Sequence, residues 1–460
     1  MTTDRLEDDG LARPARYWAV ASIGLALFMT VLDSSIANVA LPAIARDFGA
    51  KPAESIWIVN AYQLAIVTTL LPLASLGEKI GFRRVYLLGL GLFTLASLAC
   101  SLSHNLPALT AARALQGLGA AGVMSVNGGL IRFIWPHRLL GRGIGLNAVV
   151  ISISAVLAPS MASAILALGP WPWLFAVNIP VGLAALALAS RALPANPLSG
   201  RPFDFISALL NAATFGLVIS GIDIVTRTRS KLQGALELTS GLILGTFLVR
   251  REWRRPHPLV PFDLLRDRLF ALSVATSIAS FAAQTLAFVS LPFFFENTLG
   301  FDQVTTGLLM TPWPLAVGVL APLSGWVSDR ISTALLCAGG LILLAAGLAA
   351  LALMPAHPTP MDIGWRMAVC GAGFGIFQSP NNRMMLTSAP RERAGAAGGM
   401  LGTARLTGQT SGAVLTAIFF EMFANRAELI ALGVAAGLAI VAAGFSALRL
   451  QRSSRYSVTE

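Results

Sequence analysis

The sequence of 460 residues is poor in charged side chains, which make up only 12% of the chain. A soluble globular domain carries about 25% charged residues, so this composition excludes an ordinary soluble protein. The cysteines Cys100, Cys337 and Cys370 all lie in apolar stretches without the paired spacing of a metal or disulfide site, so we expect packing roles. With four histidines in or beside loops and no nucleophile cluster or phosphate loop, we expect no metal, no cofactor and no enzyme activity.

What the chain contains instead is apolar residues, at 55% of the sequence and a mean hydropathy of +0.71. Apolar segments of about 20 residues recur along it, the length of helix that crosses a bilayer. We therefore predict an all-α integral membrane protein with fourteen transmembrane spans. Their centres lie near Phe28, Ile66, Phe93, Gly119, Ser154, Ala184, Phe215, Leu242, Phe281, Val317, Leu341, Gly373, Gly408 and Ala435.

The net charge of +11 would also suit a nucleic-acid-binding protein, but the placement of the basic residues argues against that. If both termini are cytoplasmic, most lysines and arginines fall in the inner loops, which is the distribution typical of inner-membrane proteins. The richest loop, Arg250 to Arg255, would lie against anionic lipid headgroups. We predict a multi-pass protein of a bacterial inner membrane that contacts lipids and no nucleic acid.

An internal repeat divides the chain. A shift of 254 positions places Gly117 on Gly371 and Asn127 on Asn381, within stretches of similar composition. Because the repeat matches inner loops with inner loops, the two copies have the same orientation, as in transporters built from parallel repeats. We predict a six-helix bundle over residues 1–192, two additional spans with a basic linker over 193–262, and a second six-helix bundle with a tail over 263–460.

Asp33 is a carboxylate within the first span, in the run LDSSIANVALP, and no basic residue lies within a helical turn of it. A lone charge in hydrocarbon costs at least about 2.5–3.5 kcal/mol, so Asp33 should face a water-filled path or a cation. Burial favours the protonated acid, which would let Asp33 exchange a proton for a cation. The alternative is a carboxylate that snorkels or caps a helix break near Pro42.

Four stretches carry a resemblance to a known family: LDSSIANVALP, LGEKIGFRR, LTAARALQGLGAAG and GMLGTARLTGQTSG. Over nearly its whole length the chain resembles the fourteen-span drug:proton antiporter group of the major facilitator superfamily, and in particular its YebQ-type branch. The resemblance implies two six-helix bundles with two extra linker helices, alternating access, a small-molecule substrate exchanged for protons, and a monomer. The fifth span departs from the family pattern, because it keeps Pro159 but replaces the expected glycines with serine and alanine, which weakens the case for antiport.

The resemblance links proton coupling to Arg113, which occupies the position of the family's fourth-helix arginine, and we predict that Asp33 and Arg113 couple as paired opposite charges. An arginine inside a span needs an acceptor and can tune the proton affinity of a nearby acid. The alternative is that backbone carbonyls hold Arg113 in a purely structural role. The acids Asp223, Glu296 and Glu421 lie near the outer ends of spans and are second-rank candidates for carrying protons.

The resemblance also implies a cytoplasmic latch, a set of charges that would hold the inner side shut. Its predicted members are Glu78, Arg83, Arg84, Asp329, Arg330 and Arg405. Glu78 stands where the family usually has aspartate, and Ala74 where it has glycine, so the latch would be differently spaced. The alternative is that the loop charges only set the topology.

Polar and aromatic residues of spans that face the centre are candidates for the substrate site, although ordinary packing is the alternative for each aromatic residue. The predicted set is Asp33, Asn60, Gln63, Asn127, Gln284, Phe288, Trp313, Gln378, Asn381 and Asn382. We predict a proton-coupled multidrug efflux transporter for lipophilic, cationic compounds. The alternatives are a uniporter or symporter for a neutral or anionic metabolite, and a membrane sensor or scaffold that transports nothing.

Overall fold

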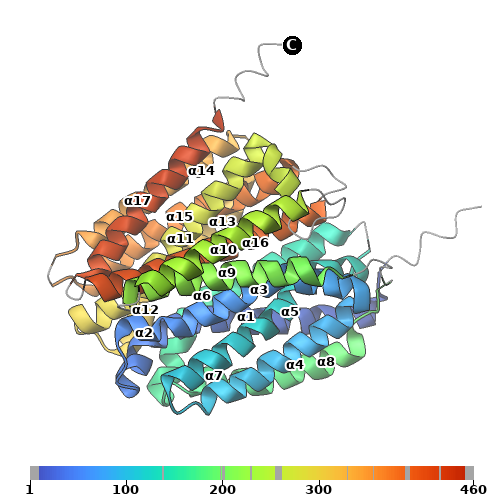
Figure 1. Cartoon of the computed structure of the whole chain (residues 1–460), viewed down its shortest axis with the longest axis horizontal. Coiled ribbons are helices and arrows are strands. Elements are labelled where there is room, and N and C mark those ends of the chain that lie inside the picture. Colours follow the sequence, from blue (N-terminus) through green and yellow to red (C-terminus); the bar gives the residue numbers. More distant parts are fainter. Residues whose placement is uncertain are drawn as a thin grey trace, which may run out of the picture.

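The computed structural model describes residues 10–136, 139–196, 198, 203–227, 231–253, 262–328, 330–355, 357–388, 394–423 and 426–450, and among these it contains helices and no strand. Most of the long helices run side by side along one direction (Figure 1). The first ten are α1 (Arg13–Asp47), α2 (Pro52–Ser55), α3 (Trp57–Ile80), α4 (Phe82–Ser101), α5 (Leu106–Ile134), α6 (Leu140–Leu168), α7 (Trp173–Ala176), α8 (Asn178–Ala192), α9 (Phe205–Arg227) and α10 (Lys231–Glu252). After η2 (Phe262–Arg266) come α11 (Arg268–Phe293), η3 (Phe294–Thr298), α12 (Gln303–Met310), α13 (Pro312–Val327), α14 (Thr333–Ala352), α15 (Pro360–Ser388), α16 (Ala394–Met422) and α17 (Ala427–Ala447).

The predicted all-α membrane architecture is confirmed. Each of the fourteen predicted span centres lies in a different helix. Twelve helical segments among the described residues are long and apolar enough to cross a membrane, and the remaining two centres fall in the 29-residue helices α15 and α16. The second, sixth and tenth spans are broken at Ile56, Val177 and Thr311. Thr311 precedes Pro312, which lacks the N–H needed to continue a helix.

The repeat glycines make equivalent contacts in the two halves, which we define as α1–α8 and α11–α17. Gly117 of α5 lies against the backbone of Tyr62 in α3, and Gly371 of α15 lies against the backbone of Trp313 in α13. A β-carbon on either glycine would overlap the facing carbonyl, so only glycine permits this approach. The two halves are therefore built on the same packing plan, while the exact boundaries predicted for them stay a prediction.

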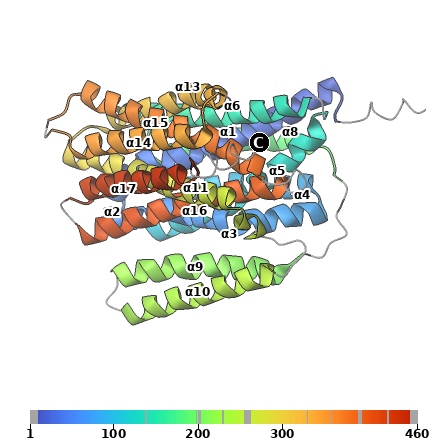
Figure 2. The same ribbon diagram turned by 90° about the horizontal axis from the view of Figure 1, so that it is seen from above.

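The pair α9 and α10 forms an antiparallel hairpin beside the rest of the molecule (Figure 2). Helix α9 contacts both α3 and α16, so the hairpin covers one place where the two halves meet. The contact has a specific cause. Pro72 lies inside α3 and has no N–H. The carbonyl of Thr68, one turn earlier, therefore lacks its usual helical donor. The Nδ2 of Asn211 in α9 donates to that carbonyl at 2.8 Å.

Substituting Asn211 by alanine should therefore destabilise the protein, because an unsatisfied buried carbonyl costs about 1–3 kcal/mol. In a Pro72→Ala background the N–H of residue 72 can bond to the Thr68 carbonyl, and the same Asn211→Ala change should then cost much less. Unfolding in lipid nanodiscs measures both effects. Thr246→Ala is a matched control, since the Thr246 hydroxyl bonds only within α10. Equal losses in the two backgrounds would show that Asn211 does not act through this carbonyl.

Candidate functional site

Asp33 lies inside the N-terminal half, and three donors from two other helices surround its carboxylate. Its Oδ2 accepts from Nη1 of Arg113 in α5 at 2.5 Å. Its Oδ1 accepts from Nδ2 of Asn178 in α8 at 2.7 Å and from Nε2 of Gln116 at 2.9 Å. The Asp33 and Arg113 side chains are 1% and 0% exposed. The structure thus brings together the two residues predicted for proton coupling, in a buried, charge-neutral pair.

Arg113 is held by more than its counter-ion. Its Nε donates to the carbonyl of Ile58 at 3.2 Å, and its Nη1 donates to Oε1 of Gln116 at 2.6 Å. The guanidinium lies 4.1 Å from the ring centroid of Tyr62, in cation–π contact. The ion pair and the backbone anchor, which the sequence offered as alternatives, therefore occur together. Besides Asp33, Arg113 therefore has a backbone carbonyl and a neutral side-chain oxygen as acceptors.

Asn178 was not identified from the sequence. It is the first residue of α8, just after the sixth span breaks at Val177, and this break helps to bring its amide to Asp33. Only one sequence signal could have found it, namely a polar side chain inside an apolar span. Tyr62 was missed as well, because an aromatic residue in a span is indistinguishable from ordinary packing.

The geometry of this pair suits a proton switch better than a cation site. Both oxygens of Asp33 already accept hydrogen bonds, so a bound cation would have to displace Arg113. A proton on Asp33 would remove its charge and leave Arg113 with the bonds to the Ile58 carbonyl and Gln116 that it already makes. The same side chains can then exist in two charge states, and a switch between conformations requires that these states prefer different conformations.

The predicted substrate residues of α3 are buried with unused hydrogen-bonding atoms. Asn60 and Gln63 are 1% and 7% exposed, and their side-chain oxygens have no partner among the described residues. In the C-terminal half, Trp313 is fully buried and its ring packs edge-on against Phe288 with 4.9 Å between centroids. Gln284, Gln378 and Asn382 are partly exposed. These positions stay predictions for substrate contact.

The repeat-related asparagines bond mainly within their own halves. Asn127 donates to Asn147 in α6 at 3.1 Å. Asn381 donates to the hydroxyl of Ser277 at 2.8 Å and accepts from the buried Arg449 at 2.9 Å. Both asparagines therefore tie helices of one half together, which is a sufficient reason for their presence.

The described residues do not assemble the predicted latch as a cluster. Arg83 donates to the carbonyl of Ser190 in α8, and Arg84 donates weakly to the carbonyl of Ile80 at 3.4 Å. Glu78 is exposed and pairs with neither arginine among the described residues. The guanidinium of Arg330 lies 4.2 Å from the ring centroid of Trp326, and Asp329 is outside the described residues. The latch stays a prediction.

Arg405, the remaining predicted latch residue, lies within α16. It makes no hydrogen bond or ion pair with the described part of the chain, and its Nε is buried without a partner. As a latch residue, Arg405 is predicted to bind an inner-side carboxylate or backbone carbonyls during closure, and the described residues show neither contact.

The two halves are joined at the end of the molecule where α1 ends. The Nη2 of Arg46 and Oε2 of Glu296 form an ion pair at 2.6 Å between α1 and η3. The hydroxyls of Ser160 and Thr311 bond at 2.9 Å, and Gly307 of α12 packs closely on Ser163 of α6. Three contacts therefore link the two halves at this end. Of the other second-rank acids, Glu421 is partly exposed, and the side chain of Asp223 is outside the described residues.

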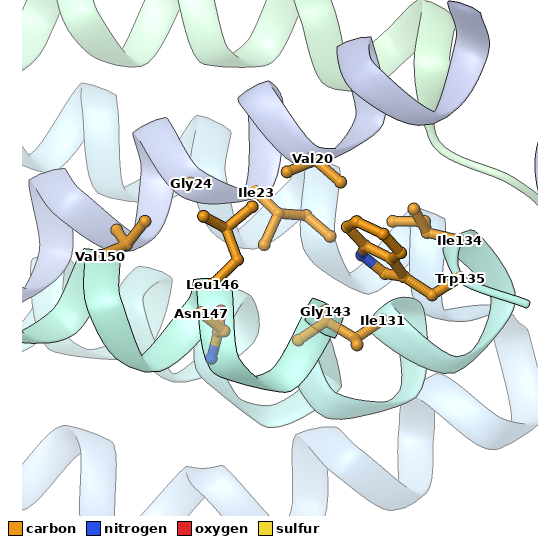
Figure 3. Close-up of a pocket in the computed structure, with 10 residues that line it drawn as sticks. All are labelled: Val20, Ile23, Gly24, Ile131, Ile134, Trp135, Gly143, Leu146, Asn147 and Val150. Carbon is orange, nitrogen blue, oxygen red and sulfur yellow. The ribbon is translucent and has the colours of Figure 1, made fainter. Parts of the chain in front are cut away.

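A pocket lies between α1, α5 and α6, entirely within the N-terminal half (Figure 3). Its lining is mostly apolar, with Trp135 at one end and Asn147 as a polar group. None of the predicted substrate residues lines it. Among the described residues no group of three or more His, Cys, Asp or Glu could hold a metal ion.

Residues 23–413 match the family model described as Major Facilitator Superfamily. The chain is 51% identical over 448 residues to the uncharacterized transporter YebQ of Escherichia coli K12, an alignment that covers 97% of this chain and 98% of that protein. It is 31% identical to the riboflavin transporter RibZ of Clostridioides difficile, over 88% of this chain and 87% of the relative. It is 32% identical to the multidrug resistance protein Stp of Mycobacterium tuberculosis, over 85% of this chain and 73% of the relative.

Solved structures share the fold. A D-xylose–proton symporter superposes with a TM-score of 0.69 at 13% identity, covering 94% of this chain and 97% of the other. At that identity the likeness concerns the arrangement of the helices alone. Together the family model and the relatives show a multi-pass membrane transporter.

Proposed function

The chain belongs to the major facilitator superfamily, and from this premise we propose that it is a proton-coupled exporter of lipophilic small molecules. It would act by alternating access in a bacterial inner membrane, as a monomer with both termini in the cytoplasm. The observation that carries the proposal is the buried pair of Asp33 and Arg113, at 2.5 Å inside a transporter fold. The relative named as a multidrug resistance protein supports export, and the riboflavin transporter shows that the related group also handles an aromatic vitamin.

In this proposal the proton acts on the conformation of the N-terminal half. A proton from outside neutralises Asp33, and Arg113 then loses its counter-ion and keeps only its bonds to the Ile58 carbonyl and Gln116. The neutral and the ion-paired forms favour different facing states, and only such a difference in preference lets a ligand drive the cycle. Loss of the proton on the inner side restores the ion pair.

The test is transport by purified wild-type protein in vesicles whose lumen corresponds to the outer side. An acidic lumen should drive a dye into the vesicles against the dye's own concentration gradient. Protons then leave the lumen, which corresponds to their entry into the cell, and each exit is exchanged for dye that enters the lumen. Rhodamine 123 and fluorescein, which share a xanthene ring system but differ in charge, are suitable probes. Nigericin, which collapses the pH gradient, and protein-free vesicles are the controls. Equal accumulation of both dyes with and without the gradient would rule out proton coupling.

A further inference from the structure

We propose that the substrate site takes compounds carrying an anionic group, and that Arg405 binds this group where α3 meets α16. The inference rests on the proposed exporter function and names its substrate class. It differs from the cation preference expected from the sequence, which depended on Asp33 as an unpaired negative charge.

The first argument is the pairing of charged side chains in and beside the spans of the two halves. The Asp33 carboxylate is neutralised by Arg113, and Glu296 is neutralised by Arg46. Arg405 has neither a counter-ion nor a hydrogen-bond acceptor among the described residues, whereas the buried Arg449, which also lacks a carboxylate partner, bonds to the neutral oxygens of Asn381 and Thr276. An arginine keeps its charge when it is buried, so a lone guanidinium in a span calls for an acceptor. A cationic substrate would be repelled here, whereas a carboxylate or phenolate would supply the missing charge.

The second argument is the direction in which Arg405 points. Gly408 of α16 packs on the backbone of Ile278 in α11, whereas Leu406 belongs to the core of the N-terminal half together with Tyr62. Successive residues of a helix are rotated by about 100°, which places position 405 between these two directions. Arg405 therefore lies on the face of α16 directed between α3 and α11, at the junction of the halves.

The third argument is what α3 presents to α16. Leu70 and Leu71 lie opposite Gly402 and Gly399, which fixes the face that α3 turns toward α16. Gln63 precedes Leu70 by two helical turns and so lies on the same face, with Asn60 at its edge. Since the two helices are antiparallel, Gln63 is about four residues, or about 6 Å along the axis, from the level of Arg405. A long arginine side chain spans such a distance.

The chemistry of these groups defines the ligand. The planar guanidinium offers parallel N–H donors that match a carboxylate or phenolate. The unpartnered amide oxygens of Asn60 and Gln63 would accept hydrogen bonds from a hydroxyl or N–H group on the same molecule. The predicted substrate is an anionic, apolar-bodied compound with at least one hydrogen-bond donor.

Binding of fluorescein and rhodamine 123 to purified protein in nanodiscs, followed by fluorescence anisotropy, tests the assignment at mildly acidic pH, where fluorescein is a monoanion that keeps a phenolic hydroxyl. Fluorescein should bind at least tenfold more tightly than rhodamine 123. Arg405→Gln should weaken fluorescein binding by about tenfold or more, equivalent to about 1.4 kcal/mol, and leave rhodamine 123 unaffected. Arg405→Lys keeps the charge but loses the paired N–H donors of the guanidinium, so its affinity for fluorescein should lie between those of the wild type and Arg405→Gln. Unfolding curves of each variant identify any loss that comes from misfolding.

The inference is overturned if rhodamine 123 binds as tightly as fluorescein, if fluorescein does not bind, or if folded Arg405→Gln binds fluorescein as the wild type does. These results are separable from the test of export. Gradient-driven accumulation of rhodamine 123 alone would leave the exporter function standing and remove the anion site. Charge-selective binding without gradient-driven transport would do the reverse.

Discussion

Asp33→Asn is expected to abolish pH-driven accumulation of substrate while leaving exchange of substrate across the membrane. Asparagine has nearly the shape of the protonated acid but cannot release a proton, so the protein would be fixed in the form that resembles protonated Asp33. Its oxygen can still accept from Arg113, which preserves the local packing. The measurement compares dye accumulation under an imposed pH gradient with dye exchange in the absence of a gradient.

A matched control lies on the same helix. Asp47, at the end of α1, accepts a hydrogen bond from Nε1 of Trp171 at 2.8 Å and has no part in the buried pair. Asp47→Asn should therefore keep pH-driven accumulation. Accumulation by Asp33→Asn at the wild-type rate would remove Asp33 from the coupling mechanism.

Arg113→Leu is expected to give the second large effect, a loss of about 3–5 kcal/mol in the free energy of unfolding. The substitution leaves the carboxylate of Asp33 buried with only the neutral donors Gln116 and Asn178. The double variant Asp33→Asn/Arg113→Leu removes both charges and should recover most of the lost stability, because no unpaired charge remains. Unfolding in nanodiscs measures the single and double variants.

This cycle separates charge from shape. Leucine also removes the hydrogen bond to the Ile58 carbonyl and the contact with the Tyr62 ring, and those losses persist in the double variant. If the double variant is no more stable than Arg113→Leu, the stability of this region comes from packing and backbone contacts, and the ion pair contributes little.

The sequence predicts the spans and Asp33 because both carry a physical cost that composition reveals. A run of about 20 apolar residues has the length and composition of a helix that spans a membrane, and a charged side chain inside such a run needs a partner. Asp33 follows from this rule, whereas the resemblance to the family supplied Arg113, which lies 80 positions away. The resemblance also supplied Arg405, as a latch residue, and gave no information on what lies opposite it.

The remaining contacts depend on how neutral side chains meet in three dimensions. Asn178 reaches Asp33 across 145 positions, and Asn211 binds a carbonyl freed by a proline in another helix. A neutral amide inside a span costs little free energy, so its presence in the sequence does not predict a partner. The latch prediction depends on a family pattern alone. That pattern supplied Glu78 and Arg83 but did not determine which residues they contact.

The most direct measurement of the central claim is proton movement triggered by substrate, read with a pH-sensitive dye sealed inside vesicles. Adding substrate to wild-type vesicles should move protons across the membrane in the direction opposite to the substrate, and Asp33→Asn vesicles should show none. Substrate-triggered proton movement of wild-type size in Asp33→Asn, or substrate transport by the wild type without any proton movement, would contradict the account.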